Sequence, residues 1–203
     1  MAESFTQVQP NQTGNKIRTR TRTVGANVVH ESAVFWPGGE TWVAYADAVA
    51  FAQNKHHITI FNSDATALVR CKKLFAVNLQ SAAVTGVFTR FDARLCSAAS
   101  VGTLITPVSF DTTNAALPGG VTVRTNGTVT NGSALFPWIA TGDEETAVAA
   151  LSKGMFQQWA NILPEGNEIQ EITLRQNQGF TIQQTTATAV GSFGWILVFT
   201  VEA

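Results

Sequence analysis

Short apolar runs rich in Val, Ile, Thr and Phe recur along most of the chain, and turn residues separate them. In HHITIFN, residues 56–62, Ile58 and Ile60 alternate with Thr59 and Phe61, which is the period-two pattern of a β-strand. Runs of this kind predict further strands at residues 67–79, 83–95, 168–176, 180–186 and 194–202, and on either side of the turn Pro37-Gly38-Gly39. The pattern therefore predicts a chain that is mostly β-structure.

A β-hairpin is predicted for GVTVRTNGTVTNG, residues 120–132. An Asn-Gly pair between two β-branched runs is typical of a two-residue hairpin loop, because both residues tolerate positive φ angles. Asn126-Gly127 is therefore expected to form a type I′ turn between two paired strands.

One segment departs from the β pattern. Thr141-Gly142-Asp143-Glu144 resembles the capping box at the start of a helix, and apolar residues follow it near helical spacing. Gly154 in the middle of this segment costs about 1 kcal/mol relative to Ala in a helix. Residues 141–163 are therefore predicted to form either a short helix or an irregular loop.

Many short strands with little helix predict an all-β fold, an antiparallel β-sandwich of the jelly-roll type. We expect one sandwich domain at residues 26–203, preceded by an extended N-terminal arm at residues 1–25 that has almost no large apolar side chain. The last strand, Trp195 to Val201, is apolar at successive positions, so it is predicted to be central in a sheet.

The arm contains KIRTRTRTV, in which every second residue is basic, namely Lys16, Arg18, Arg20 and Arg22. Residues 1–25 hold four basic residues and one acid (+3), and the remainder holds nine basic residues and thirteen acids (−4). An acidic body does not suit a dedicated nucleic-acid-binding protein. We therefore predict that the arm binds a protein partner as an added edge strand, with its arginines paired to partner carboxylates. Binding of nucleic-acid phosphates by these basic residues is the less favoured alternative.

Composition bears on assembly and location. Charged residues make up 13% of the chain and hydrophobic residues 45%. Because charge is depleted in interface cores, a surface so poor in charge favours a homo-oligomer. No stretch approaches the roughly 20 apolar residues of a membrane-spanning helix. The first residues lack the layout of a secretory signal, so the protein is expected to be made in the cytoplasm.

The sequence offers little catalytic chemistry. His56 and His57 are adjacent on a predicted strand and should point to opposite faces, so they are not expected to share a metal. Cys71 and Cys96 are expected to be buried thiols. No catalytic, metal-binding or cofactor-binding residue is predicted. The tryptophans are expected to pack in the core or at interfaces rather than form a sugar platform: Trp36, Trp42, Trp138, Trp159 and Trp195.

Several segments resemble a family of tailed-bacteriophage proteins similar to virion structural components. They are HHITIFNSD, LVRCKKLFAVNLQSAAVTGVFTRFDARL, TPVSFDTTNAALPGGVTV and ITLRQNQGFTIQQTTATAVGSFGWILVFTVE. The resemblance covers roughly residues 56–133 and 168–203 and rests on sequence style rather than on an enzymatic motif. It implies a particle-associated β-sandwich, such as a capsid decoration or cement protein, and it implies no catalytic residue.

The leading hypothesis is therefore a non-enzymatic phage virion protein that binds itself and the major capsid protein or another head or tail component. The resemblance favours a trimer over a dimer and a location in the virion. The alternative is a carbohydrate-binding receptor module of a tail fibre or tailspike. An enzyme acting on glycans is the least favoured hypothesis, because no carboxylate pair stands out.

Overall fold

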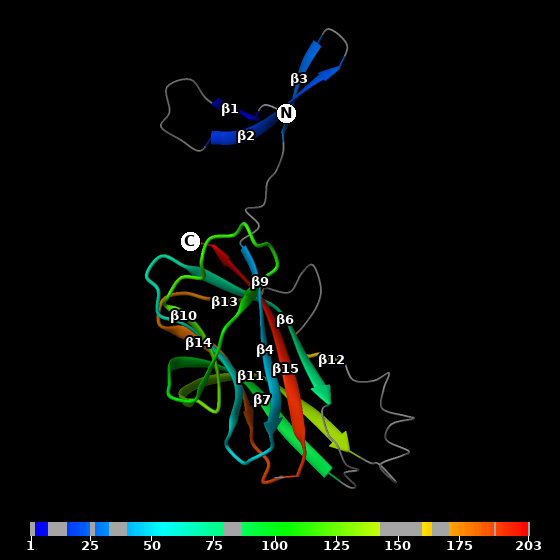
Figure 1. Ribbon diagram of the computed structural model, residues 1–203, viewed down its shortest axis with the longest axis vertical. Helices are drawn as coiled ribbons and strands as arrows, with labels where there is room; N and C mark the ends of the chain where they lie inside the picture. The colour runs from blue at the N-terminus through cyan, green and yellow to red at the C-terminus, as the bar shows by residue number, and fades with distance from the viewer. Residues whose placement is uncertain are drawn as a thin grey trace. The chain divides into compact units, whose positions relative to one another are not determined.

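The structure is a computed structural model that describes residues 3–7, 16–24, 27–32, 40–78, 87–142, 160–163, 171–188 and 190–202. The chain divides into two compact units, Met1–Gly38 and Gly39–Ala203 (Figure 1). The described part of the chain contains strands and turns but no helix.

The N-terminal unit is a three-stranded antiparallel sheet of β1 (Glu3–Gln7), β2 (Lys16–Val24) and β3 (Asn27–Ser32). KIRTRTRTV forms β2, the middle strand, whose two edges pair with β1 and with β3. The unit continues past residue 25, where the arm was predicted to end, because β3 pairs with β2.

The second unit consists of two antiparallel sheets. The first sheet has the order β12-β6-β15-β4-β9, with β13 also paired to β6. Its strands are β4 (Glu40–Ala50), β6 (Leu68–Asn78), β9 (Val108–Ser109), β12 (Ala160–Asn161), β13 (Ile172–Leu174) and β15 (Ser192–Glu202). The second sheet has the order β11-β7-β14-β5-β10-β8. Its strands are β5 (His56–Asn62), β7 (Val87–Ser100), β8 (Thr103–Ile105), β10 (Val121–Thr125), β11 (Thr128–Gly142) and β14 (Gln178–Gln184).

The strand order is that of a jelly roll, as predicted. Strands β4, β5, β6 and β7 alternate between the two sheets, and β11, β13, β14 and β15 then return beside them. As a result β15 lies between β4 and β6, and β14 lies between β5 and β7. This interleaving of two Greek keys defines the jelly roll. It also confirms the prediction that the last strand is central in its sheet.

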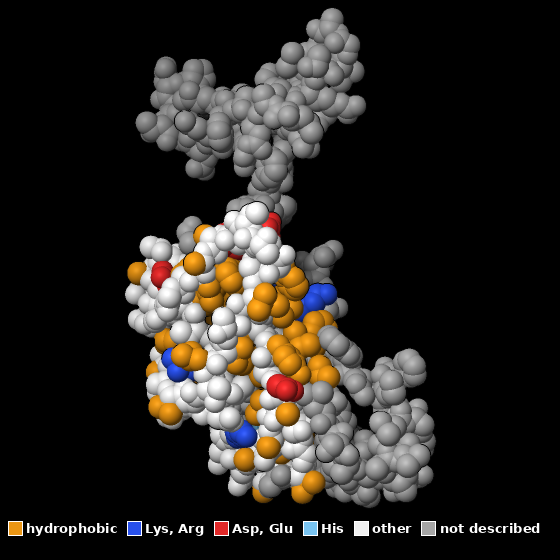
Figure 2. Space-filling model, viewed as in Figure 1, with side chains coloured by type: hydrophobic (Ala, Val, Ile, Leu, Met, Phe, Trp, Pro, Cys, Tyr) orange, Lys and Arg blue, Asp and Glu red, His pale blue; other side chains and the backbone are white. Residues whose placement is uncertain are grey.

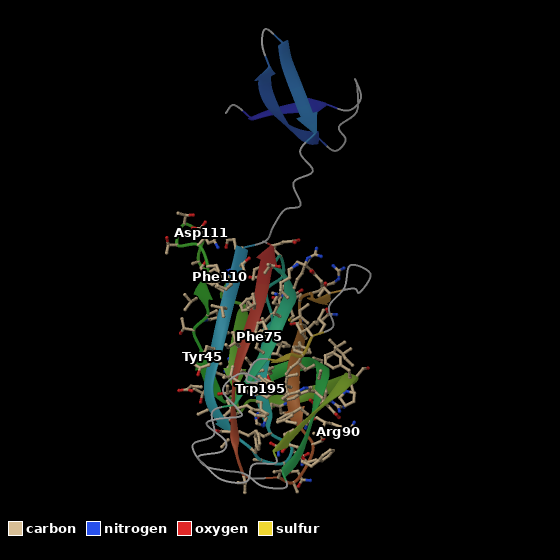
Figure 3. All side chains as sticks on the ribbon, turned by 90° about the vertical axis from the view of Figure 1, so that its right-hand side faces the viewer. Tyr45, Phe75, Arg90, Phe110, Asp111 and Trp195 are labelled. Atoms are coloured by element: carbon tan, nitrogen blue, oxygen red, sulfur yellow. The ribbon has the colours of Figure 1, made fainter. Side chains whose placement is uncertain are left out.

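Aromatic and aliphatic side chains fill the space between the sheets. Trp195 of β15 is fully buried (Figure 3) and meets Phe91 of β7 edge to face at a ring-centroid distance of 5.4 Å. Trp138 stacks on Phe91 at 5.2 Å and also meets Trp195 edge to face at 6.0 Å. Ring pairs in such geometries contribute about 0.5–1.5 kcal/mol each beyond the area they bury. The sandwich is therefore held by rings supplied from both sheets.

The prediction of a hairpin at Asn126-Gly127 is wrong. Strand β10 pairs with β5 and β8, and β11 pairs with β7, so the strands on either side of Asn126-Gly127 are not paired to each other. Asn126 does have a positive φ of 56°, but it lies at a bend where β10 continues into β11. Val101 and Gly102, with φ of 58° and 72°, form the matching bend between β7 and β8. Long-range pairing outweighed the local turn signal here.

Two other predicted elements differ in extent. The strand predicted at 83–95 is observed as Val87–Ser100, and residues 79–86 lie outside the described residues. In the segment predicted as a helix or loop, residues 141–142 end β11 and residues 160–161 form β12. Its central part, residues 143–159, also lies outside the described residues.

Candidate functional site

The outer face of the first sheet is apolar. In β4, alternate residues Trp42 and Ala44 point into the core, so Val43 and Tyr45 lie on the outer face. Because directly paired residues share a face, the register brings further apolar side chains to this side. The apolar face comprises Val43, Tyr45, Phe75, Val108, Phe110, Ile196 and Val198.

These residues are arranged in neighbouring rows. Val108 of β9, Val43 of β4 and Val198 of β15 are paired across three strands. Tyr45, Ile196 and Phe75 form the next row, across β4, β15 and β6. Figure 2 shows hydrophobic side chains gathered over the part of the sandwich where Figure 1 draws these strands. The rows form one continuous patch.

The exposed members of the apolar face are large. Tyr45 is 48% exposed, Val108 63% and Phe110 65%, and Figure 3 labels Tyr45 and Phe110 beside β4 and β9. Monomeric proteins seldom leave a contiguous apolar patch of several large side chains in water. Such a patch is typical of a surface that another protein covers.

Charged groups lie around the apolar face. Tyr45 donates a hydrogen bond of 2.9 Å from its hydroxyl to Asp47 Oδ1. Burial and this hydrogen bond raise the pKa of Tyr45. Lys73 is exposed on β6 opposite Val198, and Arg70 forms an ion pair of 3.2 Å with Glu202 at the end of β15. An apolar centre with a polar rim is the usual anatomy of a protein interface.

The four predicted partner-binding residues, Lys16, Arg18, Arg20 and Arg22, all lie on β2 of the N-terminal unit. In the register, Arg20 is opposite Glu3 of β1 and also opposite Glu31 of β3. Since both edges of β2 are paired within the chain, the sheet edges left for a partner belong to β1 and β3. The partner role of the four basic residues stays a prediction.

The histidines of β5 point to opposite faces, as predicted. His56 Nδ1 lies 3.1 Å from Thr181 Oγ1 on the outer face of the second sheet, whereas the His57 ring lies among Phe51, Phe91 and Trp195 in the core. A register shift between β5 and β14 places His57 beside Ile58 on the inner side. Neither ring faces the other, so they form no shared metal site.

Reactive chemistry is sparse in what the structure describes. Cys71 and Cys96 are buried free thiols, and burial raises the pKa of each to about 12, so neither is a thiolate near neutral pH. Within the described ranges, no group of three or more His, Cys, Asp or Glu side chains could hold a metal ion. The described residues contain no helix that is long and apolar enough to cross a membrane.

The described tryptophans pack in or against the core, as predicted. Trp42 and Trp195 are buried, and Trp138 is partly buried against Phe91. Trp36 and Trp159 lie outside the described residues. An aromatic sugar platform therefore has no support from these three residues.

Comparison with known proteins adds no relative: no family model, curated protein or solved structure matches the chain. Reasoning from sequence missed the apolar face. The sequence Trp-Val-Ala-Tyr-Ala in β4 could have indicated this face, because its outward residues are Val43 and Tyr45 rather than polar ones.

Proposed function

We propose that the protein is a structural component of a tailed-phage particle, a decoration or cement protein, and that its apolar face binds a second copy of the chain. The observation that carries the assembly role is the apolar face itself, whose exposed members Tyr45 and Val108 need a partner surface. The link to a phage particle, and the preference for a trimer, rest on the sequence resemblance over residues 56–133 and 168–203.

The jelly-roll fold is compatible with this role but does not establish it. Jelly rolls occur in viral capsid and lectin domains among others, so the fold alone leaves function open. A second copy is the preferred occupant because the rim carries both signs of charge, with Asp47 on the β4 side and Lys73 on the β6 side. A surface with both signs can complement a copy of itself.

The proposal is tested on particles purified from a lysate of cells that make the protein. Mass spectrometry should find the chain at many copies per particle, and electron microscopy should place it on the head or tail. The double variant Tyr45→Lys/Val108→Lys should be lost from particles. The charge-matched double variant Val101→Lys/Val190→Lys, at positions 68% and 61% exposed elsewhere, should be retained. Absence of the wild-type chain from particles, despite abundance in the lysate, would contradict the proposal.

A further inference from the structure

A row of polar residues crosses the outer face of the second sheet, on the opposite side of the sandwich from the apolar face. Arg124 of β10 pairs with Thr59 of β5, Thr59 with Thr181 of β14, and Thr181 with Arg94 of β7. Their neighbours along the strands, such as Ile60, point into the core. The four residues therefore share the outer face, with an arginine at each end and two threonines between them.

The two threonines of the row are held in place by hydrogen bonds. Thr59 Oγ1 lies 2.7 Å from Thr181 Oγ1, and the Thr181 hydroxyl donates to Ile58 O at 3.2 Å. Because that hydroxyl has a single hydrogen, its oxygen accepts from the Thr59 hydroxyl and from His56 Nδ1–H. Burial, together with the charge of Arg94, lowers the pKa of His56, so this imidazole is neutral at pH 7. The two threonines are buried and carry no charge.

The two arginines keep hydrogen-bond donors free. Arg124 donates from Nη1 to Val101 O at 3.0 Å, and Arg94 donates from Nη2 to Gly132 O at 3.3 Å. The Nε atom of each is buried and has no hydrogen-bond partner among the described residues. A buried donor without an acceptor is costly, so the protein does not satisfy all the hydrogen-bond donors of either guanidinium.

The charge of this face is opposite to that of the unit that carries it. Three arginines, Arg90, Arg94 and Arg124, stand against one acid, Asp92, which gives +2 locally. Residues 39–203 hold nine basic and twelve acidic residues, a balance of −3. A positive patch on a negative body attracts anionic groups to this face in particular.

The same face also offers groups that suit hydroxyls. Asp92 accepts from Arg90 Nε at 2.8 Å and lies 3.6 Å from Arg94 Nη1, and its side chain is 11% exposed. Next to it in the register is Gln183, whose Oε1 accepts from Asn131 Nδ2 at 3.1 Å. A carboxylate and two amides can bind neutral hydroxyl groups.

We propose that this row binds an acidic glycan, with ligand carboxylates at Arg94 and Arg124 and sugar hydroxyls at Asp92, Gln183 and Asn131. The two arginines are three strands apart, or roughly 14 Å at the strand spacing of a sheet. A separation of this size suits a chain of several sugars rather than a single one. The side chain of Arg90 is 48% exposed, and Figure 3 shows it on the opposite side of the sandwich from Tyr45.

The test uses the full chain and calorimetric titration at physiological salt with oligogalacturonate as the carboxylated probe, neutral dextran, and single-stranded DNA. We expect binding of oligogalacturonate alone. Arg94→Gln/Arg124→Gln should weaken it about tenfold for each arginine removed, as charge-assisted hydrogen bonds predict. The control Lys72→Gln/Arg175→Gln removes the same charge elsewhere and should change the affinity less than about twofold.

Three results would overturn the inference: no binding of oligogalacturonate, an equal loss in the control variant, or tighter binding of DNA that depends on the same two arginines. If melting shows that Arg94→Gln/Arg124→Gln does not fold, Arg124→Lys takes its place. It keeps the charge but loses the planar fork, so the affinity should still fall several-fold. Unchanged affinity in a folded Arg124→Lys variant would count against a glycan carboxylate at this position.

Discussion

His57 is a neutral imidazole enclosed by the aromatic core. Its ring centroid lies 5.1 Å from that of Phe91 and 5.7 Å from that of Trp195. Its Nε2 lies 3.1 Å from Gln184 Oε1, which can only accept, so Nε2 carries the hydrogen. Burial is the main cause that lowers the pKa of His57 from 6.5 to about 4.

This burial makes stability depend on pH. Because the pKa of His57 is lower in the folded state than in the unfolded state, the unfolded chain takes up the proton first. The contribution of neutral His57 to the free energy of unfolding is complete above about pH 6.5. It is lost as pH falls from 6.5 through 4, and the total loss is about 3 kcal/mol. Urea unfolding at pH 7.5 and 4.5 should show this loss. His57→Phe should remove most of it, and an unchanged pH dependence in that variant would contradict the assignment.

Gln184 connects two loops to the core histidine. Its Oε1 accepts from Ala52 N–H at 2.9 Å and from His57, and its Nε2 donates to Thr186 O at 2.9 Å. Gln184→Ala leaves several buried groups without partners and should lower the free energy of unfolding by about 3 kcal/mol. Gln183→Ala removes one exposed hydrogen bond and should cost less than about 1 kcal/mol. Equal losses in the two variants by urea titration would show that Gln184 has no special role.

At the scale of elements, the chain bends between β7 and β8 and again, next to it, between β10 and β11. The close approach of these two bends depends on Gly102. Its φ of 72° is unfavourable for other residues, and a Cβ there would contact Thr125 O and lie 2.7 Å from Gly127 N. Gly102→Ala should therefore destabilise the fold by about 2 kcal/mol or more. Gly119→Ala, where a Cβ meets nothing within 4 Å, should stay within about 0.5 kcal/mol of wild type. Thermal unfolding checks both, and a neutral Gly102→Ala would contradict the bend geometry.

Period-two patterns predicted the elements better than turn motifs did. The strand predicted at 56–62 is observed as His56–Asn62, because alternation reflects burial on one face of a sheet. The Asn126-Gly127 motif predicted the positive φ of Asn126. It did not predict that this φ serves a bend rather than a hairpin, because the pairing partners of β10 and β11 come from distant segments. Local sequence specifies backbone angles, whereas pairing is decided by the whole sandwich.

The candidate site was less predictable than the fold. Low charge in the composition indicated a covered surface, but only the register of β4, β15 and β6 shows that Tyr45, Ile196 and Phe75 are neighbours. The basic residues of β2 were predicted from their spacing to face a partner. That spacing gave no indication that Glu3 and Glu31 would lie opposite Arg20.

At the scale of the whole molecule, the chain consists of two units with separate strand pairings. Strands β1, β2 and β3 pair with one another within Met1–Gly38. Deleting residues 1–38 should leave the sandwich with a cooperative melt within a few degrees of the full chain, while weakening its attachment to particles. Loss of cooperative unfolding in residues 39–203 would contradict the first part, and undiminished attachment would contradict the second.

The central claim is that copies of the chain associate through the apolar face, and sedimentation equilibrium of the full chain tests it most directly. Wild type and Val101→Lys/Val190→Lys should sediment as an oligomer. Tyr45→Lys/Val108→Lys should sediment at the monomer mass of 21.7 kDa while remaining folded, because two charges would be buried without partners in the interface. A wild-type chain that stays at 21.7 kDa at high concentration, or a Tyr45→Lys/Val108→Lys variant that associates as wild type does, would contradict the claim.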